Sequence, residues 1–335
     1  MIRLTPTPLN FVGDAYIALQ TAIQIEFGTL PPYLYALYSI RPGTNVASAE
    51  RIKSIAMQEM VHFCLDCNIL NAIGGSPVIA RAGVVPTYPG WLPGHVGGAP
   101  IHLYPFSPDA IQQGMDIETP EDPIAFPALA AEAAPTITIG EYYARLDTFL
   151  ATLPADVWQP NRNQITDSQY FVGNLFAVNS YEDAHRAISD IVSEGEGTSN
   201  DPLDFQGEVA HYYRFEEIAR NQVLTKADNP VGYAWGAPLG VDYGSAYPAI
   251  PDPGSYDFSG DPAARAAQDA CNAAYTTMLL ELERAVNGES GRLGIAIRAM
   301  FDLRMAAIKA LSTPLVGSTS VAGPAFQFLP PNRSV

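Results

Sequence analysis

Two copies of a Glu-x-x-His spacing occur in this chain, Glu59-Met-Val-His62 and Glu208-Val-Ala-His211. Residues three apart on an α-helix lie on one face, so the glutamate and the histidine of each pair can reach the same metal ion. A single glutamate precedes each pair, Glu26 before the first and Glu141 before the second. This order of ligands is typical of a carboxylate-bridged dimetal centre inside a four-helix bundle.

The six positions lie on apolar faces of their expected helices. An unpaired carboxylate that is buried costs several kcal/mol or stays protonated, so four inward glutamates need positive charge among them. No lysine lies on these faces, and two divalent cations would nearly neutralise four carboxylates. The sequence therefore predicts two metal ions with six protein ligands: Glu26, Glu59, His62, Glu141, Glu208 and His211.

Composition excludes several classes of protein. The formal net charge of −17 over 335 residues argues against nucleic acid or an anionic membrane surface as a partner. No segment approaches the ~20 uninterrupted apolar residues of a membrane span, and the N-terminus lacks the basic and apolar regions of a secretory signal. We therefore expect a cytoplasmic protein. Three cysteines give no disulfide framework, and Cys64 and Cys67 are expected to be buried packing residues.

Periodicity predicts a mainly α fold in one domain, 1–335, with a bundle core at about 10–225 and extra C-terminal helices. Long Pro/Gly-rich insertions are expected at 74–135 and 226–260, and a kink or break at Pro31-Pro32. A strand is expected near 169–172. The expected helices run over about 14–40, 47–72, 136–153, 181–193, 205–224, 262–287 and 291–311.

Several motifs within about 10–225 resemble the ferritin-like family that includes the iminophenylpyruvate dimer synthases of bisindole biosynthesis. They are Ile25-Glu26-Phe27 running into Pro31-Pro32-Tyr33-Leu34, Ala56-Met-Gln-Glu59-Met-Val-His62-Phe, Thr138-Ile-Gly-Glu141-Tyr-Tyr, Glu194-Gly-Glu196-Gly and His211-Tyr-Tyr-Arg-Phe-Glu-Glu-Ile.

The resemblance implies a ferritin-like four-helix bundle with a non-haem iron centre that activates dioxygen or peroxide. The resemblance implies five of the six predicted ligands, which lie in the matching motifs: Glu26, Glu59, His62, Glu141 and His211. The sixth ligand stays open. Glu208 fits the bundle template, whereas Glu196 matches a family motif and could reach the metal from a loop. Glu194 and Glu196 are equally well explained as surface charges at a helix end. Asp66, one turn beyond His62, is a candidate acceptor for the second ring N–H of that histidine, with a solvated or capping role as the alternative.

The leading hypothesis is an oxidoreductase whose two iron ions oxidise a small aromatic or amino-acid-derived metabolite, with manganese as the other candidate metal. Two alternatives remain: an iron-storage or ferroxidase protein, and a scaffold with a structural metal. Storage ferritins tile a closed shell, which insertions of this size would obstruct. A monomer or small homo-oligomer is therefore expected.

Overall fold

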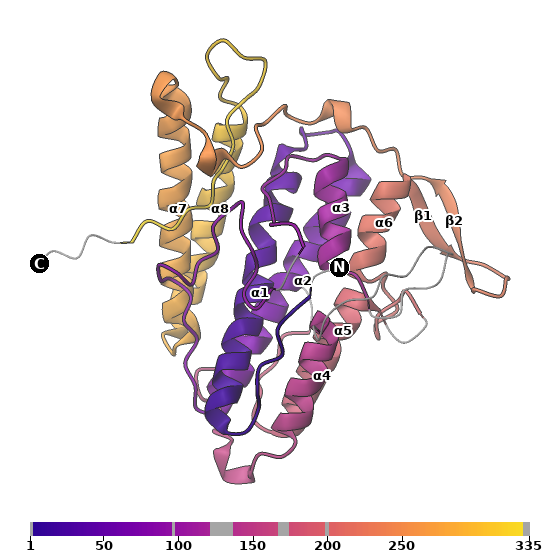
Figure 1. The fold of residues 1–335 in the computed structure, drawn as a ribbon, viewed down its shortest axis with the longest axis vertical. Helices are drawn as coiled ribbons and strands as arrows, with labels where there is room; N and C mark the ends of the chain where they lie inside the picture. The colour runs from indigo at the N-terminus through magenta and orange to yellow at the C-terminus, as the bar shows by residue number, and fades with distance from the viewer. Residues whose placement is uncertain (1–2, 96–97, 121–136, 167–173, 198–200, 331–335) are drawn as a thin grey trace, which may run out of the picture.

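A pair of long helices forms the centre of the molecule (Figure 1). The structure is a computed structural model, and it describes residues 3–95, 98–120, 137–166, 174–197 and 201–330. Helix α1 spans Val12–Ser39 and helix α2 spans Val46–Ala72. The two pack closely along their length. Because only residues 40–45 join them, they run antiparallel, as the sequence predicts.

The other half of the bundle is made from four shorter helices, α3 (Pro108–Ile117), α4 (Ile139–Leu150), α5 (Tyr181–Glu196) and α6 (His211–Arg220). Helix α3 packs on α6, and α4 packs on α5. In Figure 1 the first pair lies in the upper half of the molecule and the second pair below it. Both α3 and α4 contact α1, while α5 and α6 contact α2. The third and fourth positions of the bundle are therefore each filled by two helices, with a break between them.

Local sequence explains where three of these short helices begin. The hydroxyls of Ser107, Thr138 and Ser180 accept hydrogen bonds from backbone N–H groups in the first turns of α3, α4 and α5. Such caps satisfy donors that the helix itself leaves unpaired. Helix α6 begins at His211 after an extended Ala210 with no side-chain cap.

Two further helices, α7 (Pro262–Val286) and α8 (Leu293–Leu311), pack on one another and stand beside α1, on the side away from α3 to α6 (Figure 1). An antiparallel hairpin of β1 (Gln222–Lys226) and β2 (Tyr233–Pro238) follows α6. No helix in the described ranges has the length and apolarity needed to cross a membrane. Single 3₁₀ turns lie at Ala155–Val157, Tyr243–Ser245, Pro253–Ser255, Phe258–Gly260 and Ser290–Arg292.

The mainly α fold is confirmed, with two local corrections, at α3 and α6. A kink or break was expected at Pro31 and Pro32, and helix α1 continues through both prolines without a break. Pro32 cannot donate to the carbonyl of Gly28, but the Tyr88 hydroxyl donates to that carbonyl at 2.6 Å and satisfies it. Helix α3 lies in a segment expected to be irregular. The helix expected at 205–224 covers only 211–220 and is followed by β1. The strand expected at 169–172 lies outside the described residues.

Candidate metal centre

Five buried or nearly buried side chains meet at the level where the short helices break. Glu26 comes from α1, Glu59 and His62 from α2, Glu118 from the residue that ends α3, and His211 from the first turn of α6. They form two triads, Glu26–Glu59–His62 and Glu59–Glu118–His211, each with ligand atoms within 4.8 Å of one another. Glu59 belongs to both triads, so it occupies the position of a bridging carboxylate.

Both histidines direct Nδ1 toward the carboxylates. Nδ1 of His62 is 3.5 Å from Oε2 of Glu26 and 3.6 Å from Oε1 of Glu59. Nδ1 of His211 is 2.9 Å from the same Glu59 oxygen and 3.6 Å from Oε2 of Glu118. The two rings stack with centroids 5.6 Å apart. Each imidazole therefore faces the shared carboxylate as a member of its own triad.

The opposite nitrogen of each ring is held by a hydrogen-bond acceptor. Nε2 of His62 is 2.9 Å from Oε2 of Glu194, and Nε2 of His211 is 3.2 Å from Oε1 of Gln58. Arg214 also donates to that Gln58 oxygen, which fixes it as an acceptor. Nε2 of His211 must then carry the proton, and a neutral His211 presents the lone pair of Nδ1 to the cluster. This is the usual outer support of a metal-binding histidine.

Each carboxylate has one oxygen held by a hydroxyl. Thr29 donates to Oε2 of Glu59 at 2.9 Å, and Tyr33 donates to Oε1 of Glu118 at 2.5 Å. The Tyr143 hydroxyl lies 2.6 Å from Oε1 of Glu26. In all three residues the other oxygen is the one that faces a histidine Nδ1. The hydroxyls therefore orient the carboxylates toward the centre of the cluster.

The pKa values show how strongly these charges interact. Burial and the charge of Glu59 raise the pKa of Glu26 to about 7, and the same two causes raise the pKa of Glu118. Burial lowers the pKa of His62, but hydrogen bonds to Glu194, Glu26 and Glu59 outweigh it and raise the pKa well above its ordinary value. Without another cation, protons must neutralise this cluster.

The residues present fit a pair of metal ions. Nδ1 of His211 is buried and makes no hydrogen bond of acceptable geometry within the described part of the chain. A cavity of about 40 Å³ lies beside Glu26, Glu59, His62 and Glu118, enough for species the size of a water molecule. Imidazole and carboxylate ligands together suit iron, manganese or zinc.

The structure brings Glu26, Glu59, His62 and His211 together but not Glu141 or Glu208. The Glu141 side chain is 42% exposed and pairs with Arg145 at 3.0 Å. The Glu208 side chain is 64% exposed and pairs with Arg214 at 3.2 Å. These two positions correct the sequence prediction.

The causes of the two corrections differ. Glu208 precedes α6, so the three-residue helical spacing that would bring it next to His211 does not apply. Glu141 lies in the first turn of α4, and Tyr143, two residues later, is the side chain that enters the cluster. Glu196 is the last residue of α5, and its side chain lies outside the described residues.

Sequence reasoning missed Glu118 and left Glu194 undecided. A signal for α3 was present, because Ser107-Pro108 is a cap followed by a proline at the first helical position, and Glu118 ends that helix. Glu194 is a buried partner of His62 rather than a surface charge. It occupies the place expected for Asp66, whose Oδ2 is instead 2.7 Å from the Tyr143 hydroxyl.

A family model described as ferritin-like matches residues 19–220, which include every residue of the cluster. The chain belongs to the ferritin-like family. A solved structure of a ferritin-like protein from Caulobacter vibrioides is similar to this ferritin-like chain, with a TM-score of 0.62 and 22% identity over 95% of this chain and 100% of the other. At that identity the similarity shows the fold alone. No curated protein matches the chain.

Proposed function

We propose that this ferritin-like chain is an oxidoreductase with two iron ions bound by Glu26, Glu59, His62, Glu118 and His211. The observation that carries the proposal is the pair of triads that share Glu59. The position of Nδ1 of His211 supports it, because this buried nitrogen faces Oε1 of Glu59 at 2.9 Å without a hydrogen bond of acceptable geometry, an arrangement that a shared metal ion would satisfy.

When bound, an iron pair would supply the activation of dioxygen or peroxide for oxidation of an organic molecule. Around it, Glu194 and Gln58 orient the two imidazoles, and Thr29, Tyr33 and Tyr143 orient the carboxylates.

Asp66 and Tyr143 also hold a proton close to Glu26. The single phenolic proton lies between two carboxyl groups, at 2.6 Å from Glu26 and 2.7 Å from Asp66. Burial and the charge of Glu26 raise the pKa of Asp66 well above its ordinary value. The raised pKa favours the protonated form of Asp66, which removes one negative charge from the surroundings of Glu26.

The cavity beside the cluster favours an apolar or aromatic substrate at its mouth. Its volume of about 40 Å³ admits water-sized molecules next to the carboxylates, not an organic metabolite. The resemblance to the iminophenylpyruvate dimer synthases agrees with an aromatic or amino-acid-derived substrate. Five aliphatic side chains line this cavity together with the cluster residues: Ile25, Ile117, Ile139, Ile191 and Val192.

The same small volume supports a second candidate, a ferroxidase whose substrate is iron itself. Such an activity needs only iron and oxidant to reach Glu59 and its neighbours, and the cavity admits both. The number of iron ions oxidised per chain separates the two candidates.

The test is to load metal-free protein with ferrous iron without oxygen, count the bound metal, and then follow oxygen or hydrogen peroxide consumption. We expect about two ions per chain on the two-metal template and rapid reaction with oxidant. Glu59→Ala should remove both bound metal and reaction, while Cys67→Ala, a buried thiol outside both triads, should keep them. Turnover of many irons per chain would favour the ferroxidase. A ferrous protein inert to both oxidants would refute both redox candidates and leave a structural metal.

A further inference from the structure

A second, much larger cavity lies on the other side of α1 and α2 from the metal cluster. It has a volume of about 500 Å³, is open to solvent on one side, and is lined by α1, α2, α8, the connection that follows α1, and Tyr247. Figure 1 shows α8 beside α1, opposite the short helices that complete the cluster. Cavities of about 300–1,000 Å³ are typical of small-molecule sites. No residue of the cluster lines it.

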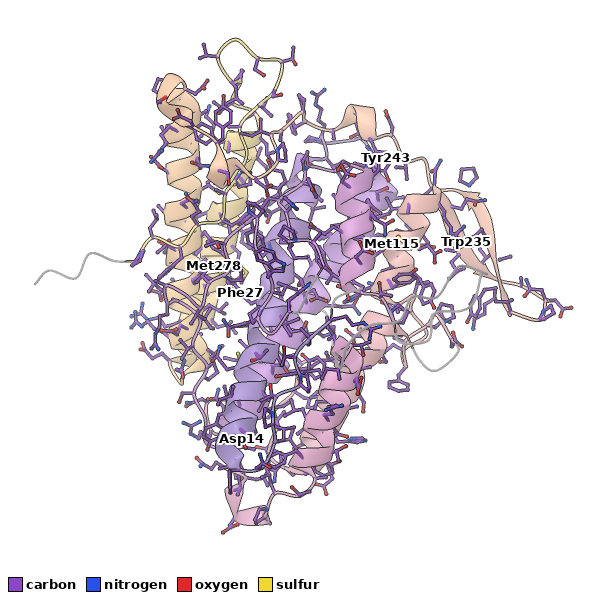
Figure 2. The ribbon with its side chains drawn as sticks, in the orientation of Figure 1. Asp14, Phe27, Met115, Trp235, Tyr243 and Met278 are labelled. Carbon is purple, nitrogen blue, oxygen red and sulfur yellow. The ribbon has the colours of Figure 1, made fainter. Side chains whose placement is uncertain are left out.

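The interior of this cavity is apolar and adaptable. Three methionines line it, Met57 and Met60 from α2 and Met300 from α8. Methionine has flexible side-chain torsions and accommodates ligands of varied shape. Met60 and Met300 also line a smaller apolar cavity of about 50 Å³ that reaches Phe27 and Met278. Figure 2 shows Phe27 at the edge of α1 that faces the outer helix pair and Met278 within that pair. The two cavities adjoin, so an apolar chain that enters the large one has a continuation toward the interior.

The charged residues that line this cavity are mostly basic, although the chain as a whole is acidic. The chain has 35 acidic and 18 basic residues, yet Arg41, Lys53 and Arg304 line this cavity and Glu50 is the one acid among the lining residues described. None of the three cations forms an ion pair with an acidic group within the described ranges. The guanidinium of Arg41 lies 5.1 Å over the ring of Tyr247, which also lines the cavity.

We propose that this cavity binds one single-chain amphiphilic carboxylate, an acyl chain whose carboxylate lies among Arg41, Lys53 and Arg304. The tail would run along Met57 and Met60 toward the smaller cavity. Charge complementarity decides the class of ligand, because unpaired cations around an apolar cavity favour an anionic head and disfavour a cationic one. The site is independent of the metal centre, so metal-free protein should bind the same ligand.

The test is calorimetric titration of full-length protein, metal-free and metal-loaded, with three ten-carbon probes: decanoate, decanol and decyltrimethylammonium, all below their micelle concentrations. We expect decanoate to bind one molecule per chain, decanol more weakly, and the cation not measurably. Lys53→Glu and Arg304→Glu should each weaken decanoate at least about fivefold, the factor that corresponds to a well-placed exposed ion pair. Arg145→Glu makes the same charge change on α4, far from the cavity, and should leave the affinity unchanged.

A variant that fills the cavity without changing any charge tests whether the ligand needs the cavity itself. Ile297→Trp on α8 places a large ring at the lining of the cavity and should abolish decanoate binding while the thermal melt stays cooperative. Equal binding of decanol and decanoate, or decanoate binding unaffected by both charge reversals, would overturn the proposal. The proposal would also be overturned if the wild-type protein were a dimer, Phe301→Asp dissociated it, and neither the dimer nor the dissociated variant bound decanoate. Phe301 lines the cavity with 63% of its surface exposed, and that result would make this face an interface between copies.

Discussion

Glu59→Gln should remove both metal ions, whereas Glu118→Gln should remove one. The reason is geometric: Glu59 belongs to both triads, while Glu118 belongs only to the one completed by His211. Glutamine keeps the size of the side chain but loses the charge that would bridge two cations. The two variants therefore differ in stoichiometry, not only in affinity.

The magnitude follows from linkage between binding and folding. A metal ion at a free concentration about 100 times its dissociation constant stabilises the folded state by about 2.7 kcal/mol. Two such sites contribute about 5 kcal/mol, which for a chain of 335 residues corresponds to a rise in Tm of about 8 °C on metal addition. Glu59→Gln should lose nearly all of that rise, and Glu118→Gln about half. Comparing each variant with and without metal cancels the effect of the substitution on the metal-free protein.

The assay combines native mass spectrometry, which counts ions per chain, with differential scanning calorimetry. Glu141→Gln and Glu208→Gln are matched controls, since both side chains are exposed and paired with arginines. Both controls should keep two ions and the full rise in Tm. Retention of both ions by Glu59→Gln, or loss of an ion from either control, would show that the ligand assignment is mistaken.

Three further predictions follow from the same geometry. Metal affinity should fall by about tenfold per pH unit for each proton released as the pH drops below the pKa values of His62 and His211, which hydrogen bonds to the carboxylates raise above the ordinary value, because protons then compete with the metal for Nδ1. Competition with a metal indicator dye measures this fall, and a flat profile would contradict it. Tyr143→Phe should lower the free energy of unfolding by about 1–3 kcal/mol in urea titrations, because the buried carboxyl groups of Glu26 and Asp66 lose a hydrogen-bond partner. A free energy of unfolding equal to that of the wild type within error would show that water replaces the lost hydroxyl. Gly114→Ala should destabilise the protein by about 1–3 kcal/mol, because a Cβ there would lie 2.8 Å from the ring of Phe215 at the contact between α3 and α6; a wild-type melting temperature would show that this contact is loose.

The long helices and the candidate ligands within them were predictable because their apolar patterns are long. Helices α1 and α2 each carry many turns of apolar spacing, so the inward phase of Glu26, Glu59 and His62 could be assigned from periodicity alone. Within an unbroken helix, this phase determines the direction in which a side chain points. The described structure brings Glu26, Glu59 and His62 together.

The candidate ligands at helix ends were not predictable in the same way. The phase of Glu208 depends on whether α6 begins before or after it, and sequence signals place helix boundaries only within a few residues. Glu118 lies beyond the last turn of a short helix within a Pro/Gly-rich segment, where no long periodic pattern exists. Its position comes from tertiary packing of α3 on α6, which the sequence does not display.

Because the third and fourth positions of the bundle are each divided between two helices, the two triads of the candidate metal centre differ in how firmly the backbone holds their side chains. Glu26, Glu59 and His62 lie within unbroken helices, while Glu118 and His211 lie at helix ends. The first ion should therefore enter a preformed half-site, and the second should bind only as two helix ends are drawn together. Part of the free energy of binding the second ion then goes into ordering the backbone at those two helix ends. The two ions should therefore load in sequence, the second more weakly than the first.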